Sequence, residues 1–518
     1  MRWWDGSRCL PALTGPSWET SLPAGAASTA RTDAATCWCG MLADTPGRPT
    51  MSISWSRPSR FMTAATSASP ASSESGRRTA PSRRATPPGT AERATPSRWG
   101  SFHWGLFHWG AAAVAAGALL VFTNGPLLLF SKSVLDRTGR WEDHAVWPAL
   151  AAAAICGAAL AARRVLGASG RQQARSSRVA AVAVGWFALA ALASTLWSVD
   201  PTATAWRSSV YVGMALLAWA IASFDHNEVA AVVAAVAGAA VAASLLLVWL
   251  RPDLGLHPDG SWKGVYTNRN SLAPLAAVGV LVGVRYLLAS GGWRRLAAAC
   301  GVAAAMATLA GAGSRTAWIS LAVATAAATV VGSHRQLHRR YGPAAARTAT
   351  AAAAALATSV TVVAVAVQWD VPTFGQRREM WGLVWDRIVQ RPLLGHGFFT
   401  FWDIEELTQH VLLRRGSAHN SLVEVGLGLG LLGAVPFTVI VLLAAGNAGS
   451  ALWRRPGPDT WFGAALVAFL IVENLTESFV LWFSYSWVLL MAASLRPAPA
   501  ADRLAAAAPR RESPGADG

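Results

Sequence analysis

Residues 228–250 read EVAAVVAAVAGAAVAASLLLVWL, an apolar stretch whose one charged residue is Glu228 at its start. A helix of this length, rising about 1.5 Å per residue, crosses the roughly 30 Å hydrocarbon core of a bilayer. Its alanine and glycine side chains are small enough to let neighbouring helices approach closely. The stretch therefore predicts a membrane-spanning helix.

Similar apolar blocks follow one another from about residue 104 onward. They lie near 106–130, 145–162, 179–197, 209–224, 228–250, 271–290, 295–313, 316–333, 348–368, 421–445, 459–476 and 478–495. Because each block has about the length of a membrane span, the sequence predicts an all-α polytopic integral membrane protein with about 12 transmembrane helices.

The composition excludes an ordinary soluble protein. Apolar residues make up 53% of the 518 residues and charged residues 14%, whereas soluble domains carry about 25% charged residues. The net charge of +17 comes from arginines in loops and tails rather than from a basic helix, so the lipid bilayer, and not nucleic acid, is the expected partner. The five cysteines are not spaced as a disulfide framework.

The two ends of the chain differ from its middle. Residues 1–103 are rich in Arg, Ser and Pro, and such a leader cannot bury enough apolar surface to fold. It lacks the apolar core of a signal peptide, and translation starting later, at Met51, Met62 or beyond, stays open. We therefore expect a disordered leader, a membrane domain over 104–496 and a disordered cytoplasmic tail over 497–518.

Arginine density in short loops indicates the orientation. The loops 163–178 and 334–347 are the richest in arginine, which places them in the cytoplasm. An even number of spans then puts both termini inside, in a multi-pass protein of the cytoplasmic (inner) membrane. The longest connection, 368–420, becomes an extracytoplasmic loop between the ninth and tenth spans, and loops of this length are usually functional or disordered.

The loop 368–420 contains the stretch 374-FGQRREMWGLVWDRIVQRPLLGHGFFTFW-402. Helical spacing puts its apolar residues Met380, Trp381, Val384, Trp385 and Ile388 on one face. This pattern predicts an amphipathic helix at the membrane surface, ending before a proline and a glycine turn.

Five motifs occur in order between about residues 190 and 430. They are Leu196-Trp197-Ser198-Val199-Asp200-Pro201; Gly264-Val265-Tyr266-Thr267-Asn268-Arg269-Asn270; Ser314-Arg315-Thr316-Ala317; Arg377-x-x-x-Trp381 with Arg391-Pro392-Leu393-Leu394-Gly395-His396-Gly397; and Ala418-His419-Asn420-Ser421-Leu422-x-Glu424. In this combination the chain resembles the O-antigen ligase and O-antigen polymerase superfamily, whose members are polytopic membrane glycan ligases and polymerases.

The resemblance implies a glycosyltransferase of polysaccharide biosynthesis in the cell envelope. Such an enzyme transfers a glycan from a polyprenyl diphosphate carrier, such as undecaprenyl diphosphate, to a glycan or lipid-glycan acceptor. Arg315 and Arg377 match the family's arginines, and guanidinium groups suit the charge that develops on a leaving diphosphate. An arginine that merely snorkels to lipid phosphate is the structural alternative.

The resemblance implies that His419 is the general base, since a neutral imidazole can take the proton from an acceptor hydroxyl. An interfacial histidine bonded to a lipid headgroup is the structural alternative. His396 is a weaker candidate, since it lies in a glycine turn. Asn420 is expected to orient His419, and Glu424 to do the same or to pair an arginine.

The remaining substrate-binding candidates are Asn268, Arg269, Asn270 and Arg391. Asn270 is also a candidate N-cap for the sixth span. No paired carboxylates with metal spacing occur on the outer face, so neither a metal nor another cofactor is expected. A direct displacement with one base would invert the anomeric carbon.

Other classes of function remain open. A transporter or lipid-linked oligosaccharide flippase would also need about twelve spans, but it predicts ionisable residues near the midplane. A scaffold would explain the spans without explaining the motifs. Within the enzyme class, the residues do not distinguish a ligase from a polymerase.

Overall fold

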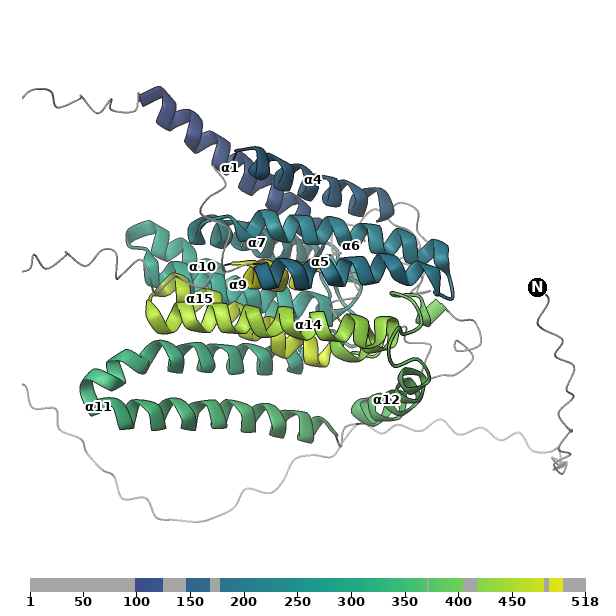
Figure 1. The fold of residues 1–518 in the computed structure, drawn as a ribbon. Helices are drawn as coiled ribbons and strands as arrows, with labels where there is room; N and C mark the ends of the chain where they lie inside the picture. The colour runs from purple at the N-terminus through teal and green to yellow at the C-terminus, as the bar shows by residue number, and fades with distance from the viewer. Residues whose placement is uncertain are drawn as a thin grey trace, which may run out of the picture. The chain divides into compact units, whose positions relative to one another are not determined.

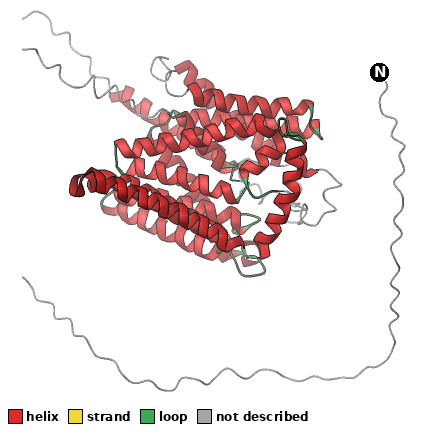
Figure 2. Cartoon of the chain, turned by 60° about the horizontal axis from the view of Figure 1, so that its bottom comes forward, coloured by secondary structure: helices red, strands yellow, loops and turns green. Residues whose placement is uncertain are grey.

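The structure is a computed structural model that describes residues 98–123, 146–167, 178–369, 372–403, 417–478 and 484–496, all within the compact unit Glu92–Gly518. The other unit, Met1–Ala91, lies outside the described residues, as does the predicted tail 497–518. Helices dominate the described part (Figure 2), where the β pairing consists of a single bridge between Leu256 and Trp262. The predicted all-α class is therefore confirmed for these residues.

The helices are named in chain order as in Figure 1. They are α1 (Arg98–Val121), α4 (Val146–Gly167), α5 (Arg178–Ala193), the 3-10 helix η1 (Ser194–Leu196), α6 (Pro201–Ala222), α7 (His226–Leu250), the short α8 (Pro252–Gly255), α9 (Arg269–Ala289), α10 (Gly292–Ala312), α11 (Arg315–Trp369), α12 (Pro372–Gln390), the 3-10 helix η2 (Phe401–Asp403), α14 (Ser421–Arg454), α15 (Pro458–Thr476) and α16 (Tyr485–Leu495).

Among the described residues, eight helices are long and apolar enough to cross a membrane. They are Arg178–Leu196, Pro201–Ala222, His226–Leu250, Arg269–Ala289, Gly292–Ala312, Arg315–Ala345, Ser421–Arg454 and Pro458–Thr476. Each coincides with one of the twelve predicted blocks. The described parts of the first, second and twelfth blocks form shorter apolar helices, Gly110–Val121, Ala149–Leu160 and Tyr485–Leu495. A polytopic membrane protein is supported, and the number twelve stays a prediction.

The eighth and ninth predicted blocks form the two arms of α11. Gly342, between them, has φ 86° and ψ 171°, and Pro343 follows it. Glycine adopts such a φ without a steric penalty, and proline cannot continue the helical hydrogen bonds. The chain therefore reverses there, and the arms run back along one another in Figure 1.

Polar caps fix where several helices begin. Asp225 and Glu228 form a reciprocal capping box at the start of α7, and the Asp200 carboxylate accepts from the backbone of Ala203 in α6. At α9 the cap is Asn268, whose Oδ1 accepts from the backbone N–H of Asn270. The prediction that Asn270 is the N-cap is therefore wrong by two residues, because the first asparagine of the Asn-Arg-Asn sequence satisfies the free N–H group.

An aromatic cluster anchors the segment after α12 to the helical core. Phe398 packs edge-on against Tyr211 of α6 with ring centroids 5.2 Å apart, and Tyr211 lies 5.1 Å from Phe187 of α5. Trp487 of α16 lies 5.7 Å from Phe187 and is fully buried. The backbone N–H of Phe398 also donates to the hydroxyl of Ser194 at 3.0 Å. This anchoring holds the loop that follows α12 against the end of the bundle.

Candidate functional site

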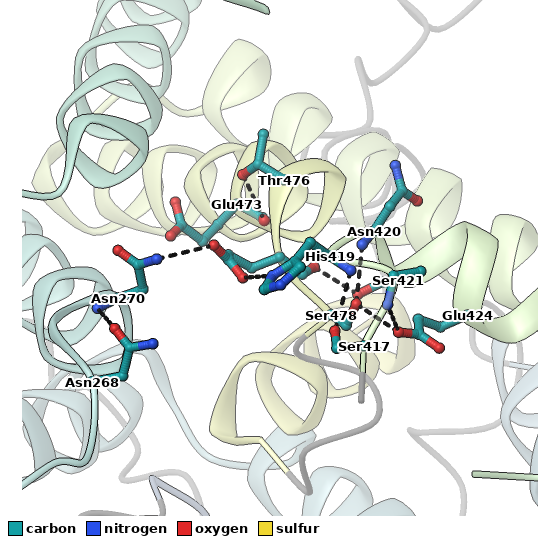
Figure 3. A network of polar contacts seen from close by, with 12 residues as sticks. Asn268, Asn270, Ser417, His419, Asn420, Ser421, Glu424, Glu473, Thr476 and Ser478 are labelled. Carbon is teal, nitrogen blue, oxygen red and sulfur yellow. Dashed lines mark hydrogen bonds and ion pairs between the residues drawn. The ribbon is translucent and has the colours of Figure 1, made fainter. Parts of the chain in front are cut away.

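Several of the sequence motifs meet at one end of the bundle. The backbone N–H of Val199 donates to the carbonyl of His396, which joins the first motif to the fourth. Asn270, from the second motif, shares a carboxylate partner with His419 from the fifth. Asn270 and Glu477 are 207 positions apart in sequence, and with His419 they form one polar region, drawn in Figure 3.

A tight turn presents His419. Its φ is 52°, in the left-handed region that non-glycine residues seldom adopt, and its backbone N–H donates to the hydroxyl of Ser417 at 3.1 Å. Residues 417–420, here called the His419 turn, end at Asn420, whose Oδ1 accepts from the N–H groups of Leu422 and Val423 as the N-cap of α14. The strained backbone is therefore held from both sides.

The imidazole of His419 is paired with Glu477 at the end of α15. Nδ1 lies 2.7 Å from Oε2 of Glu477, and the two side chains are 23% and 11% exposed. A carboxylate only accepts, so the proton of a neutral imidazole sits on Nδ1, and Nε2 keeps its lone pair. Asn270 of α9 donates to the other carboxylate oxygen at 3.4 Å. This arrangement can orient a general base.

Asn420 does not orient the imidazole. Besides capping α14, its side-chain amide donates to the carbonyl of Leu475, and its backbone N–H donates to the hydroxyl of Ser478. These bonds tie the His419 turn to the end of α15, which carries Glu477. The expectation that Asn420 orients His419 is therefore corrected: Asn420 fixes the backbone of the turn, and Glu477 holds the ring.

The Glu424 side chain stabilises the His419 turn through hydrogen bonds. Its buried carboxylate accepts from the backbone N–H of Ala418, from the indole of Trp402 at 2.9 Å and from the hydroxyl of Ser478 at 3.1 Å. Among the described residues it contacts neither the His419 ring nor an arginine. Its oxygens accept from these three donors rather than holding the His419 ring. The pairing of Glu424 with an arginine stays a prediction, because the side chain of Arg377 lies outside the described residues.

The loop of residues 391–401, here called the Gly395 loop, is clamped onto a break in α14. The N–H groups of His396 and Gly397 donate to the carbonyls of Leu427 and Gly428, at 3.0 Å and 2.9 Å. Gly430, with φ 59°, interrupts α14 at this point. A Cβ on Gly395 would lie 2.4 Å from the backbone carbon of Gly428. Glycine is needed at positions 395 and 430 because the backbone of the Gly395 loop lies in contact with the backbone of α14.

His396 stabilises the contact between the Gly395 loop and α14 and does not belong to the polar region around His419. The residue is 8% exposed, and its Nε2 lies 2.9 Å from the carbonyl of Arg387, to which it donates. Burial lowers the pKa of His396, the bond to the Arg387 carbonyl raises it, and the charges of Arg391 and Arg387 lower it further. A neutral, structural histidine fits these surroundings.

The candidate arginines are placed differently from one another. Arg315 begins α11, is exposed and makes no hydrogen bond or ion pair with a described residue. Arg269 pairs with Asp259 at 3.3 Å, and both side chains are largely exposed. Arg391 is exposed just after α12. Arg377 lies within α12, and its side chain is outside the described residues.

Glu473 adds a second carboxyl that sequence reasoning did not select. It is 1% exposed and faces Ser320 of α11, yet its two carboxyl oxygens and the Ser320 hydroxyl have no hydrogen-bond partner among the described residues. Arg315 precedes Ser320 by about 7.5 Å along α11, and Glu477 follows Glu473 by about 6 Å along α15. Because α11 begins where α15 ends, Arg315 and Glu477 lie toward the same end.

Sequence reasoning also missed Glu477 as a site residue. It follows the predicted eleventh span directly, and an acidic residue at the end of an apolar block is the one local signal that could have selected it. The described residues contain no group of three or more His, Cys, Asp or Glu side chains arranged to hold a metal ion.

Residues 299–438 match the family model described as O-Antigen ligase. This stretch includes the start of α11, all of α12, the Gly395 loop and the His419 turn. This part of the chain is similar to the O-antigen ligase family. The predicted resemblance is thereby confirmed. No curated protein matches the sequence. Asn268 and Asn270 precede the matched residues and Glu477 follows them. Of these three, Glu477 enters the site through geometry alone.

Proposed function

We propose that this protein is a membrane glycosyltransferase. It takes a glycan from a polyprenyl diphosphate-linked donor at the outer face of the cytoplasmic membrane and joins it to a glycan or lipid-glycan acceptor. The observation that carries the proposal is the His419–Glu477 pair, 2.7 Å apart, in a turn that belongs to the stretch matching the O-antigen ligase family.

His419 acts as the general base in this proposal. The acceptor oxygen bonds to the anomeric carbon, the bond from that carbon to the diphosphate oxygen breaks, and the hydroxyl proton moves to Nε2 of His419. Glu477 holds the ring through Nδ1 and stabilises the imidazolium that forms. Direct displacement of this kind inverts the anomeric carbon.

Arginines neutralise the leaving diphosphate. Arg315 is suited to this role because it is exposed and has no partner among the described residues, and the proposal assigns the same role to Arg377. Guanidinium groups bind phosphate oxygens through two parallel hydrogen bonds. Arg269 and Arg391, also accessible, are proposed to bind the donor, whereas Asn268, Asn420 and Glu424 support the site by capping and bracing.

The experiment compares a deletion strain complemented with wild type, His419→Ala, Arg315→Ala or Arg377→Ala at equal membrane abundance. We expect each variant to leave carrier-linked glycan on the outer leaflet. Matched controls are His257→Ala and Arg251→Ala, because both residues lie outside the site in the segment between α7 and α9, where Arg251 pairs with Asp253. Full rescue by the three site variants would remove the proposed site.

The length of the accumulated glycan then separates the two enzyme types. Single repeat units on the carrier indicate a polymerase, and full-length chains indicate a ligase. Carrier-linked glycan trapped on the inner leaflet would instead favour the flippase.

A further inference from the structure

One face of α12 and the turn after it expose a set of apolar side chains, here called the α12 patch. Its members are Trp385 (63% exposed), Val389 (58%), Leu393 (65%) and Leu394 (45%). Trp385 and Val389 are four residues apart and therefore neighbours on the helix surface. Large exposed apolar side chains in such a group indicate an interaction surface.

The opposite face of α12 is attached to the His419 turn. Met380 and Val384 are buried in a small cluster with Ala418 and Leu427, and the indole Nε1 of Trp381 donates to the carbonyl of Ala418 at 2.7 Å. The peptide unit that accepts this bond directly precedes His419. The position of α12 therefore bears directly on the position of the His419 turn.

The α12 patch continues onto the apolar outside of the spanning helices. The carbonyl of Leu394 accepts from the indole of Trp197, and the carbonyl of Leu393 accepts from the N–H of Leu432 in α14. Next to Leu432, Leu431 is 55% exposed, and Trp186 of α5, which donates to the Leu432 carbonyl, is 52% exposed. An outer surface shared with two candidate spans is a surface that lipid covers.

Charged residues border the α12 patch. Asp386 and Glu379 are exposed and lie about 100° and 120° around the helix from Trp385, at about 100° per residue. Arg387 in the last turn of α12 and Arg391 just beyond it are also exposed. In Figure 1, α12 lies crosswise to α14 at its end. A crosswise helix with an aromatic face and arginines at its end has the features of an interfacial helix.

We propose that the α12 patch docks into the lipid leaflet at this end of the bundle and thereby sets the position of the His419 turn. Trp385, Val389, Leu393 and Leu394 enter the acyl region of the leaflet, and Arg387 binds lipid phosphate. α12 thus lies between lipid on one side and the candidate general base on the other. The lipid contact is independent of the proposed function, whereas its effect on transfer rests on that function.

The test measures depth in a nanodisc of phosphatidylethanolamine and phosphatidylglycerol. The five native cysteines are replaced by serine, and a nitroxide is attached to Val389→Cys, Leu393→Cys or, as the matched control, Asp386→Cys. We expect the first two labels to be relaxed mainly by oxygen, which concentrates in lipid, and the Asp386→Cys label mainly by a water-soluble nickel chelate. These sites are on the surface, so labels there leave the core intact.

Two results would overturn the lipid contact. If the labels at 389 and 393 respond like the label at 386, the patch faces water. If both reagents are excluded from them, protein covers the patch, and a second copy of the chain becomes its occupant.

A second arm tests the link to His419. Val389→Asp should slow transfer in nanodiscs by about tenfold or more, because a small displacement of a catalytic group lowers the reaction rate strongly. Asp386→Asn should leave the transfer rate unchanged. Deep labels combined with unchanged Val389→Asp activity would keep the lipid contact and reject the link. If wild type itself shows no transfer, the proposed function fails while the depth result stands.

Discussion

Nδ1 of His419 lies 2.7 Å from Oε2 of Glu477, although 58 positions separate the two residues. The pair joins the start of α14 to the end of α15, and Asn270 of α9 holds the far carboxylate oxygen. The partly exposed imidazole thus has a fixed orientation with Nε2 left to accept a proton. An imidazole oriented by a carboxylate, as in catalytic triads, is identified by the distance between the two groups and not by their spacing in the sequence.

Glu477→Gln should lower kcat by about 100-fold or more with little change in KM, because an amide can still accept from Nδ1 but cannot stabilise the imidazolium. Purified protein in nanodiscs with a lipid-linked donor provides the measurement. Glu477→Asp should recover part of the rate, and Asp253→Asn, at an exposed carboxyl outside the site, should retain all of it. Equal rates for wild type and Glu477→Gln would exclude Glu477 as a positioning residue.

His419→Asn should abolish most transfer while leaving the fold intact. Asparagine tolerates the left-handed φ of 52° better than alanine does, so the turn is preserved while the base is removed. We expect an activity loss of about 100-fold to 10,000-fold, the usual contribution of a general base. Membrane abundance and thermal stability should match those of wild type. A variant with substantial activity would show that another group accepts the proton.

Gly395→Ala should destabilise the protein strongly, because φ at this position is 66° and the added carbon would lie 2.4 Å from the backbone of Gly428. The matched control is Gly382→Ala in α12, where a Cβ meets nothing within 4 Å. There alanine should stabilise by about 0.5 to 1 kcal/mol, because glycine weakens a helix interior. The apparent melting temperatures of Gly395→Ala and Gly382→Ala in nanodiscs test both predicted changes in stability. Similar melting temperatures for the two variants would contradict the backbone contact between the Gly395 loop and α14.

Local patterns predicted the parts of this structure that depend on local physics. Apolar blocks were enough to place eight spans, because crossing a bilayer requires only length and composition. The proline after Arg391 marked the end of α12 at Gln390 correctly. Glu477 could not be assigned in this way, since its role depends on a contact with His419 from another helix.

Two cases show what local sequence patterns do not determine. Periodicity put Trp385 on the same apolar face as Met380 and Val384, and the structure leaves Trp385 63% exposed while Met380 and Val384 are 1% and 0% exposed. A helical period identifies an apolar face without showing how much of that face protein covers. Asn268 and Asn270 both suited a helix start, and the choice between them depended on where the preceding loop delivers the chain.

Acidification should destabilise the protein through His396. Burial lowers the pKa of this residue in the folded state; the hydrogen bond to the Arg387 carbonyl opposes this shift, and the charges of Arg391 and Arg387 add to it. The unfolded chain, with a histidine pKa of about 6.5, then binds more protons, so stability present above that pH is lost as the pH falls.

The corresponding variant is His396→Gln, whose amide can still donate to the Arg387 carbonyl. Its apparent melting temperature should change less than that of wild type between about pH 7.5 and pH 5.5, because this titration is removed. The two proteins are compared in the same nanodiscs. An equal acid shift in both would assign the effect to other groups.

Glu473 and Glu424 are both buried carboxyls, and their environments predict opposite responses to removal. Glu424 accepts from Ala418, Trp402 and Ser478, so Glu424→Met leaves buried donors unpaired and should destabilise by about 3 kcal/mol or more. The two carboxyl oxygens of Glu473 have no hydrogen-bond partner among the described residues, so Glu473→Met, of similar length, should be neutral or stabilising. Apparent melting temperatures in nanodiscs distinguish the two. If Glu473→Met proves stable but slow in transfer, the unpartnered carboxyl one turn from Glu477 is retained for activity; if it is stable and fully active, Glu473 has no part in the reaction.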